Sequence, residues 1–442
     1  MSNIEGFVDW FRGAAPYINA HRDRTFVIQF GGEALLDPAF PELVHDLALL
    51  DSLGIRLVLV HGARPQIDSR LADAGHAVEY VRGLRVTTAE TIGPVLEAVG
   101  AARIEIEALL SMGLANSPMA GARLRVASGN VVTARPIGIR SGVDFQHTGQ
   151  VRRIDGEGIR RRLDEGAIVL VSPLGYSPTG EVFNIPAEQV ATEIAIELKA
   201  AKLLFLVESD GLEDDSGALI AQLGIEEAKH TLAQWWRGEH DVVSERARLL
   251  AAALHACRNG VNRTHLVDRS RSGALLLELF TRDGIGTMVN ADPYDAVRRA
   301  GIDDVGGILE LIAPMESEGA LVRRSRERLE TEIDHYLVVE RDGTVIACAA
   351  IHPFAEQSSA EFACLAVHPD YRKGGWGDRL LEIGERDARA GGAEHLFVLT
   401  TQAVHWFKER GFVDVGVEAL PVERRADYDS ARRSRVLRKL LV

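Results

Sequence analysis

The sequence predicts a two-domain α/β protein, in which a mainly parallel, three-layer sheet domain precedes a smaller α+β domain. Residues 25–290 alternate short apolar runs with helical stretches, the pattern of a parallel sheet covered by helices. Between residues 361 and 401 a strand, a glycine-bearing loop, a helix and another strand follow one another. The 442 residues are also too many for one ordinary core. We therefore expect a first domain at 1–290, a linker at 291–296 and a second domain at 297–442.

Composition narrows the possible functions. The formal net charge of −14 argues against a nucleic-acid binder, whose footprint is basic. The three cysteines show no metal-ligand or disulfide spacing, so we expect a reduced, cytoplasmic protein without a bound metal. The first residues lack the pattern of a signal peptide, and no apolar run approaches the ~20 residues that span a bilayer. We expect no membrane association.

The first domain is predicted to begin with a helix before Thr25. This short amphipathic segment carries Phe7, Trp10, Phe11 and Tyr17. It would either interlock with another subunit of a homo-oligomer or fold back on its own domain. Strands are expected at 25–30, 55–60, 167–171, 203–207 and 264–267, and helices at 43–53 and 65–74. Glycines follow the first two strands, at the carboxyl ends where such sheets bind ligands, namely Gly31, Gly32 and Gly62.

The second domain is predicted to contain an anion-binding loop. Phe362 to Val367 is a short apolar strand, and a helical pattern starts at Asp378. Between them, glycines in Arg372-x-x-Gly375-x-Gly377 let the backbone approach a ligand, and a helix N-terminus offers unpaired N–H groups to an anion. This arrangement predicts a pyrophosphate cradle, although an ordinary strand-to-helix turn would have a similar loop.

With its flanks, this stretch resembles the GNAT family of acyl-CoA-dependent N-acetyltransferases. A strand at 396–401 and the segment His405-Trp-Phe-Lys-Glu-Arg-Gly-Phe412 complete the pattern, and the resemblance covers residues 295–442. It implies acetyl-CoA as a co-substrate, with no permanently bound cofactor. The pyrophosphate would lie on the loop, and the pantetheine arm would pair with the preceding strand. The implied contacts are Cys364, Leu365, Val367, Arg372, Gly374, Gly375 and Gly377.

Residues 10–290 are similar to the amino acid kinase fold, in its N-acetylglutamate kinase branch. The markers include Phe26-Val-Ile-Gln-Phe-Gly-Gly and Leu59-Val-His-Gly-Ala-Arg-Pro. A phosphoryl transferase needs positive charge on the transferred phosphate. This chain has Gln29 where the kinases have a lysine, and Ala63-Arg64 interrupts their glycine-rich loop. We therefore interpret the first domain as a kinase fold that has lost its chemistry.

The resemblance also implies an effector site for arginine in the first domain. In arginine-sensitive kinases of this family, an N-terminal helix with a Tyr-Ile motif closes over a pocket. The corresponding residues here are Tyr17, Lys202, Glu278, Gly284 and Gly286. Glu278 would hold the guanidinium or ammonium group of the effector by a charge-assisted contact. A core aromatic and plain turn glycines are the alternative interpretations of Tyr17, Gly284 and Gly286.

The two halves together resemble the N-acetylglutamate synthases, which open arginine biosynthesis. The implied reaction transfers acetyl from acetyl-CoA to the α-amino group of L-glutamate, with L-arginine as feedback inhibitor. Glu361 is our candidate base, although a strand-end glutamate is often only solvent-exposed. Thr400 is our candidate donor to the leaving thiolate, because Phe407 stands where many GNAT enzymes have a tyrosine.

Glutamate carries two carboxylates, which arginine side chains bind in a bidentate manner. The resemblance assigns substrate contacts to Arg323, Arg432 and Ser434, and leaves Arg324, Arg326 and Arg433 as alternatives. The backbone N–H of Cys364 or Leu365 would support the oxyanion, with the Cys364 thiol filling the core. Two other functions stay open: a bifunctional synthase and N-acetylglutamate kinase, and a non-catalytic arginine sensor that only binds acyl-CoA.

Overall fold

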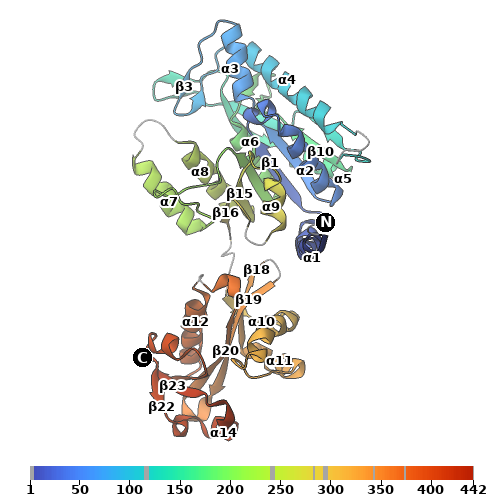
Figure 1. Cartoon of the computed structure of the whole chain (residues 1–442). Coiled ribbons are helices and arrows are strands. Elements are labelled where there is room, and N and C mark those ends of the chain that lie inside the picture. Colours follow the sequence, from blue (N-terminus) through green and yellow to red (C-terminus); the bar gives the residue numbers. More distant parts are fainter. Residues whose placement is uncertain are drawn as a thin grey trace. The chain divides into compact units, whose positions relative to one another are not determined.

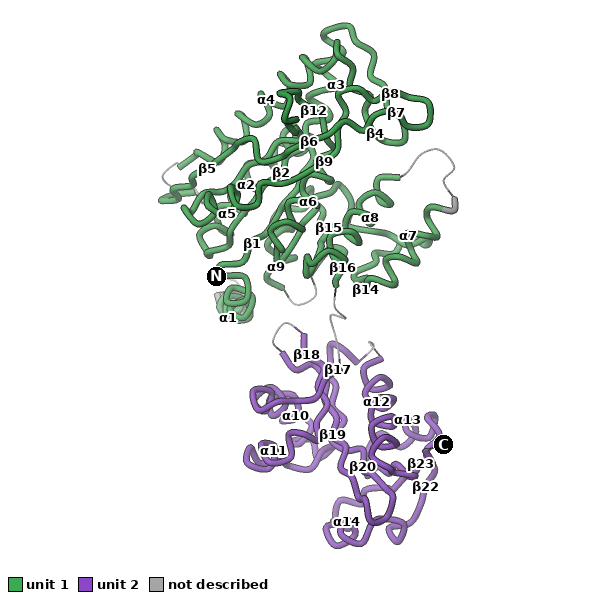
Figure 2. The backbone as a smooth tube through the Cα atoms, turned by 180° about the vertical axis from the view of Figure 1, so that it is seen from behind, with its two compact units in different colours: residues 1–293 green, residues 294–442 purple. Residues whose placement is uncertain are grey.

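The structure is a computed structural model that describes residues 4–113, 119–238, 244–281, 284–291, 297–341, 344–372 and 375–441. The chain divides into two units, residues 1–293 and residues 294–442 (Figure 2). Residues 292–296, most of the expected linker, lie outside the described residues.

The first unit is built on an eight-stranded sheet. Its strands in spatial order are β14 (Gln222–Gly224), β16 (Thr287–Asn290), β15 (Arg263–Asp268), β13 (Lys202–Val207), β1 (Thr25–Phe30), β2 (Arg56–His61), β10 (Ala167–Val171) and β5 (Arg125–Ala127). Only the β15–β16 pair is antiparallel. The five predicted strands correspond to β1, β2, β10, β13 and β15, each within one residue at either end, so the alternation did predict a mainly parallel sheet.

Helices cover both faces of this sheet (Figure 1). One layer contains α5 (Gly156–Asp164), α6 (Ala187–Leu198), α7 (Ile225–Gly238) and α8 (Glu245–Arg258). The other contains α1 (Ile4–His21), α2 (Phe40–Ser52), α4 (Ile92–Leu110) and α9 (Ala274–Phe280). The short helix η1 (Gly32–Leu36) and α3 (Arg64–Asp73) follow β1 and β2. The helices that the sequence predicted at 43–53 and 65–74 correspond to α2 and α3.

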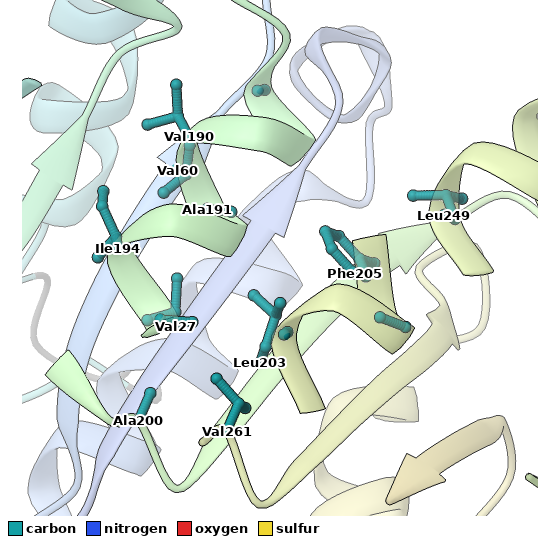
Figure 3. Close-up of a cluster of buried hydrophobic side chains, with 14 of the residues drawn as sticks. Val27, Val60, Val190, Ala191, Ile194, Ala200, Leu203, Phe205, Leu249 and Val261 are labelled. Atoms are coloured by element: carbon teal, nitrogen blue, oxygen red, sulfur yellow. The ribbon is translucent and has the colours of Figure 1, made fainter. Parts of the chain in front are cut away.

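Side-chain alternation along β1 produces the two faces. Val27 packs with the α5–α8 layer, whereas Phe26 and Ile28 pack with the α1–α9 layer. Figure 3 shows side chains of α6 on the first face, with Val190 near Val60 and Ile194 near Val27. Each such fully buried side chain stabilises the fold by roughly 1.5–3 kcal/mol. The strand ends that carry the glycine loops are therefore held in place by a rigid sheet.

Three small sheets flank the large one. A four-stranded sheet has the order β12 (Val182–Asn184), β11 (Leu174–Tyr176), β6 (Val132–Pro136) and β9 (Gly149–Ile154). The two-stranded sheets pair β3 (Tyr80–Val81) with β4 (Leu84–Arg85), and β7 (Ile139–Arg140) with β8 (Val143–Asp144). These strands lie outside the predicted elements because most are two or three residues long, and because β6 and β9 carry arginines instead of a short apolar run.

The second unit contains a seven-stranded sheet. Its strands in spatial order are β17 (Val297–Arg299), β18 (Tyr336–Arg341), β19 (Thr344–Phe354), β20 (Ser359–Val367), β21 (His395–Thr400), β23 (Arg435–Leu440) and β22 (Val413–Val415). Its helices are α10 (Val305–Ser317), α11 (Arg326–Glu332), α12 (Trp376–Ala390), α13 (Val404–Lys408) and α14 (Val422–Ala426). Short 3₁₀ helices lie at Ile302–Asp304, Ile333–His335, Ala355–Gln357, Pro369–Tyr371, Val417–Ala419 and Ser430–Arg432.

The sheet of the second unit separates two hydrophobic clusters. Phe362 packs with the α12 and α13 side, whereas Tyr336 and Cys348 pack with the α10 and α11 side. All neighbouring strands are antiparallel except β20 and β21. The predicted strand 362–367 is the second half of β20, and the predicted strand 396–401 is β21 shifted by one residue.

Candidate active site

An opening between β20 and β21 defines the candidate site of the second unit. The parallel ladder joins Ser359–Glu361 to His395–Phe397 and ends there, although both strands continue. From Phe362 onward, the β21-side edge of β20 has no strand partner among the described residues. Backbone N–H and C=O groups along such an edge are available to an extended ligand. Leu365 and Val367, two predicted cofactor contacts, lie on this stretch.

A β-bulge at Cys364 turns the backbone at this opening. The register of β20 against β19 shifts between Cys348 and Ala350, and Cys364 has a φ of +52°. A positive φ is uncommon for a residue with a side chain. Ala363 and Cys364 consequently both face the α10 and α11 side, whereas strict alternation would separate them. The bulge re-aims the peptide groups at the position where the sequence predicted oxyanion support.

Glu361 is buried at the head of this opening. Its side chain is 8% exposed and points to the α10 and α11 side of the sheet. The guanidinium of Arg424, on α14, holds both carboxylate oxygens: Nε donates to Oε2 at 2.6 Å and Nη2 donates to Oε1 at 3.1 Å. His352 lies directly opposite on β19. Burial lowers the pKa of His352, so it is neutral near pH 7.

The arginines predicted to bind substrate lie near one loop. Arg432 donates to the carbonyls of Gly319 and Ala320, at 2.9 and 3.4 Å, immediately before the Leu321–Ser325 segment. In that segment Arg323 is exposed, whereas Arg324 is partly buried and turned toward the sheet. Arg324, which the sequence left as an alternative, is the more buried of the two arginines. The carbonyl of Ser434 accepts a hydrogen bond from the hydroxyl of Tyr428 at 2.8 Å.

Two cysteine thiols lie beneath the bulge. The thiol of Cys348 donates toward the carbonyl of Cys364 at 3.6 Å, and both residues are buried. The Cys348 thiol, the charge of Arg324 and the hydroxyl of Tyr336 hold the pKa of the Cys364 thiol below its ordinary value, against the effect of burial. Cys364 thus fills the core, as expected, but in a polar corner of it.

The glycine loop precedes α12. Arg372 is exposed, Gly375 has a φ of +71° at the N-cap of α12, and Gly374 lies outside the described residues. A Cβ on Gly377 would lie 3.1 Å from the ring of Trp406, so a glycine lets α12 approach α13. The free N–H groups of a 15-residue helix therefore begin at this loop.

Thr400 and Phe407 lie on the far side of the opening. Thr400 is three residues beyond the end of the ladder, or roughly 10 Å along β21. Its hydroxyl oxygen accepts from the N–H of Ala403 at 2.9 Å, which leaves the O–H proton for another partner. Phe407 is buried and packs on Phe362 and Phe412. The ring fills the core and offers no acid.

The predicted effector residues meet in the first unit. Lys202 Nζ donates to Nε2 of His265 at 3.1 Å, and Nδ1 of His265 donates to Glu278 at 2.6 Å. The other oxygen of Glu278 accepts from the N–H groups of Ile285 and Gly286, at 2.7 and 3.0 Å. Glu278 is thus already satisfied by protein donors. Sequence reasoning missed His265, which stands next to Lys202 only through the β13–β15 pairing.

Burial and hydrogen bonding shift the pKa values of this chain of residues. Burial, and then the charge of Lys202, lowers the pKa of His265 to about 4. Burial opposes ionisation of Glu278, but the hydrogen bonds from His265 and the two backbone N–H groups outweigh it and lower the pKa of Glu278 to about 2. At neutral pH His265 is therefore a neutral imidazole and Glu278 a carboxylate.

Glycines 284 and 286 fit the close packing around Glu278. Gly284 has a φ of +61°, and a Cβ there would lie 2.5 Å from Glu278; a Cβ on Gly286 would lie 2.2 Å from the carbonyl oxygen of Leu266. The helix α1 borders this region: His21 donates to the carbonyl of Leu279 at 2.9 Å, and Tyr17 lies one turn earlier. The five predicted effector residues thus lie in one region.

The carboxyl ends of β1 and β2 border a cavity of about 400 Å³, lined among others by Gln29, Ala63 and Arg64. Arg248 also lines it; its Nη1 donates to the carbonyl of Gly83 at 3.2 Å, and its Nε lies 3.8 Å from Glu188. An amide at position 29 supplies no charge for phosphoryl transfer.

Within the described residues, no group of three or more His, Cys, Asp or Glu side chains is arranged to hold a metal ion. None of the described helices combines the length and apolar character that a membrane crossing requires.

The fold and the site define an amino acid kinase-type domain joined to an acetyltransferase domain. Residues 24–268 match the amino acid kinase family, and residues 307–412 match the acetyltransferase (GNAT) family. The chain is 56% identical over 438 residues to an amino-acid acetyltransferase of Pseudomonas putida (strain GB-1), covering 98% of this chain and 99% of that one. An amino-acid acetyltransferase of Pseudomonas syringae pv. syringae is 55% identical over 435 residues, with the same coverage.

Solved structures agree with this assignment. N-acetylglutamate synthase from Neisseria gonorrhoeae, complexed with coenzyme A and L-arginine, is 39% identical, with a TM-score of 0.89 over 98% of this chain and 99% of that chain. The same enzyme with coenzyme A and N-acetyl-glutamate is 40% identical, with a TM-score of 0.63 over 99% of each chain. The chain belongs to the amino-acid acetyltransferase family, with the N-acetylglutamate synthases.

Proposed function

We propose that the protein transfers acetyl from acetyl-CoA to the α-amino group of L-glutamate, giving N-acetyl-L-glutamate and CoA, and that L-arginine inhibits it through the first unit. The observation that carries the acetyl transfer is the buried Glu361 at the end of the β20–β21 ladder, beside an unpaired strand edge. The synthase complexes with coenzyme A, N-acetyl-glutamate and L-arginine support the choice of ligands. Feedback by L-arginine would place the reaction at the start of arginine biosynthesis.

Each chemical requirement has a candidate in the second unit. Glu361 takes a proton from the glutamate ammonium, because the protonated amine is not nucleophilic. The peptide N–H groups of Cys364 and Leu365, turned by the bulge, stabilise the oxyanion as the amine attacks the thioester carbonyl. The O–H of Thr400 donates to the departing thiolate. The loop at Arg372, Gly375 and Gly377 holds the pyrophosphate of CoA at the start of α12.

Substrate carboxylates are assigned to the arginine side chains beside the Gly319–Ser325 loop. Arg324 belongs to this loop, Arg432 contacts it, and Ser434 lies near the start of β23. Arg323 is the weaker candidate because its side chain is exposed. We further propose that the chain works as a cytoplasmic homo-oligomer. Trp10 and Phe11 of α1, 44% and 55% exposed, support a subunit contact at this helix.

One assay separates this function from its two alternatives. Thiol release is followed with acetyl-CoA, with and without L-glutamate and ATP. We expect CoA release that requires glutamate and is indifferent to ATP. A non-catalytic sensor would release no CoA, and a bifunctional enzyme would form an acylphosphate from N-acetylglutamate and ATP. Glutamate-independent CoA release would contradict the assigned acceptor.

A further inference from the structure

The ion pair between Glu361 and Arg424 raises a chemical difficulty for the proposed reaction. Among the described residues, Arg424 is the only side chain that hydrogen-bonds the Glu361 carboxylate, and it engages both oxygens. The base must instead contact the ammonium group of the substrate. A guanidinium at this position repels that ammonium and competes for the same oxygens. Glutamate therefore needs a way to separate the pair.

The α-carboxylate of glutamate supplies that way. The α-ammonium and the α-carboxylate are attached to the same carbon, so any pose that brings the ammonium to Glu361 brings the carboxylate close to Arg424. Exchange then replaces one ion pair by two: Arg424 with the α-carboxylate, and Glu361 with the ammonium. The guanidinium of Arg424 can pair in a bidentate manner with the carboxylate of Glu361 and equally with the α-carboxylate of the substrate.

The surroundings of Arg424 suit such an exchange. Its side chain is 21% exposed and belongs to the short helix α14, at the rim of the site. Its remaining nitrogen makes only a long contact, 3.4 Å, with the carbonyl of Asp427. Arg432 is held differently, because one of its nitrogens already donates to the carbonyl of Gly319 at 2.9 Å. Arg424 is thus the arginine whose main partner is the base itself.

We propose that Arg424 is a specificity-determining residue that passes from Glu361 to the α-carboxylate of the incoming amino acid and thereby releases the base. The inference rests on the proposed function. During the step that follows, one proton moves from the substrate ammonium to a carboxylate oxygen of Glu361, and the guanidinium keeps its charge throughout. An amino acid without a free α-carboxylate would leave Arg424 on Glu361.

The test compares Arg424→Gln with wild type on three acceptors. These are L-glutamate, L-glutamine, which lacks the γ-carboxylate, and L-isoglutamine, in which the α-carboxylate is an amide. We expect Arg424→Gln to lower kcat/KM for glutamate and glutamine by roughly 10- to 150-fold, mainly through KM, because a hydrogen bond to a charged group is lost. The kcat/KM for isoglutamine should not fall. If one of the three amino acids is not acetylated, its binding to the two enzymes is compared by its inhibition constant against glutamate.

Arg425→Gln is the matched control, because Arg425 lies on the same helix and donates to the carbonyls of Glu418 and Leu420 rather than to Glu361. It should leave the preference for glutamate over isoglutamine unchanged. Arg424→Lys keeps the charge but not the bidentate geometry, so it should restore part of the preference for glutamate over isoglutamine. It replaces Arg424→Gln in the test if that variant does not fold.

Two results overturn the inference. Equal losses for glutamate and isoglutamine would mean that Arg424 only holds α14 or orients the base. A loss confined to substrates with a γ-carboxylate would place Arg424 at the other end of glutamate. Absence of CoA release by the wild type with glutamate would instead refute the proposed function, so the two failures are distinguishable.

Discussion

Glu361 is the residue on which the proposed chemistry depends. Glu361 is buried, is paired with Arg424 and lies at the end of a parallel ladder. We expect Glu361→Gln to lower kcat by roughly 10²- to 10⁴-fold, the usual contribution of a general base, because the amide cannot accept the ammonium proton. Steady-state rates at saturating glutamate and acetyl-CoA measure this effect.

Binding of acetyl-CoA should hardly change in that variant, since the loop that precedes α12 is untouched. The exposed Glu356, on the 3₁₀ helix before β20, gives a control, and Glu356→Gln should keep the wild-type rate. A Glu361→Gln enzyme that retained wild-type kcat at neutral and mildly acidic pH would remove Glu361 from the role of base.

The Lys202–His265–Glu278 chain makes the first unit sensitive to acid. The folded pKa of His265, about 4, lies below its ordinary value of 6.5, so between these values the unfolded chain binds a proton that the folded chain does not. Stability therefore falls as pH decreases from 6.5 to 4. Glu278, with a folded pKa of about 2, extends the loss below pH 4.5.

We expect His265→Asn to flatten this dependence, because the amide still donates to Glu278 but does not titrate. The slope between pH 6.5 and 4 should decrease by at most about 1.4 kcal/mol per pH unit, the contribution of one proton. Hydrogen exchange resolved on β13 and β15 measures the stability of this unit alone. The exposed His230→Asn is the control; an unchanged slope in His265→Asn would contradict the assignment.

The sequence predicted several residues of the candidate site, but not the side chains that contact them in the folded protein. Gly375 was predicted from a local glycine motif, and Glu361 and Arg432 from the family resemblance. Arg424 and His352 were not, because both meet Glu361 only through the folded sheet and α14. Likewise Arg323 and Arg324 are indistinguishable in the sequence, and the turn of the chain after α10 decides which of them faces inward.

The strand–loop–helix element makes a separate prediction about acetyl-CoA. Gly375 is left-handed at the N-cap of α12, where a Cβ costs roughly 1–2 kcal/mol. We expect Gly375→Ala to shift the loop, and hence to raise KM for acetyl-CoA while leaving KM for glutamate nearly unchanged. Initial-rate measurements with each substrate varied in turn test this expectation.

Gly306, in α10 of the same unit, provides the contrast. A Cβ at this position would meet no other atom within 4 Å, and the residue belongs to a helix, so Gly306→Ala should stabilise the unit by up to about 1 kcal/mol without changing either KM. Equal effects of Gly375→Ala on both substrates would mean that the loop supports the whole site rather than the pyrophosphate.

The larger elements were predictable because their physical signal is strong. Strands such as β1 and β10 are apolar on both sides, as expected for a sheet with two helical layers. The early end of the β20–β21 ladder and the bulge at Cys364 were not predictable, since the first shows only in the strand pairing and the second in a single backbone angle. The opening between β20 and β21 and the bulge at Cys364 are the two features that distinguish the candidate site from the rest of the sheet.

For the molecule as a whole, chemistry and the proposed regulation belong to different units. In the first unit, Gln29 stands where phosphoryl transfer needs a cation, whereas a compact cluster of polar residues surrounds Glu278. Any effect of arginine on acetyl transfer must then be a coupling free energy between two sites. Glu278→Gln tests this coupling, because it removes the charge but keeps the size of the side chain.

We expect L-arginine to weaken glutamate binding in the wild type by roughly 5- to 150-fold, the usual range of such coupling, and glutamate to weaken arginine binding by the same factor. In Glu278→Gln, arginine binding itself should weaken, with kcat in the absence of arginine nearly unchanged. Calorimetric titration of arginine, with and without glutamate and CoA, measures both directions. Glu197→Gln, at the surface end of α6, is the control. Inhibition of turnover without any change in the calorimetric affinity for glutamate would show that arginine acts on a catalytic step rather than on glutamate binding. An unchanged titration in Glu278→Gln would place the effector away from Glu278.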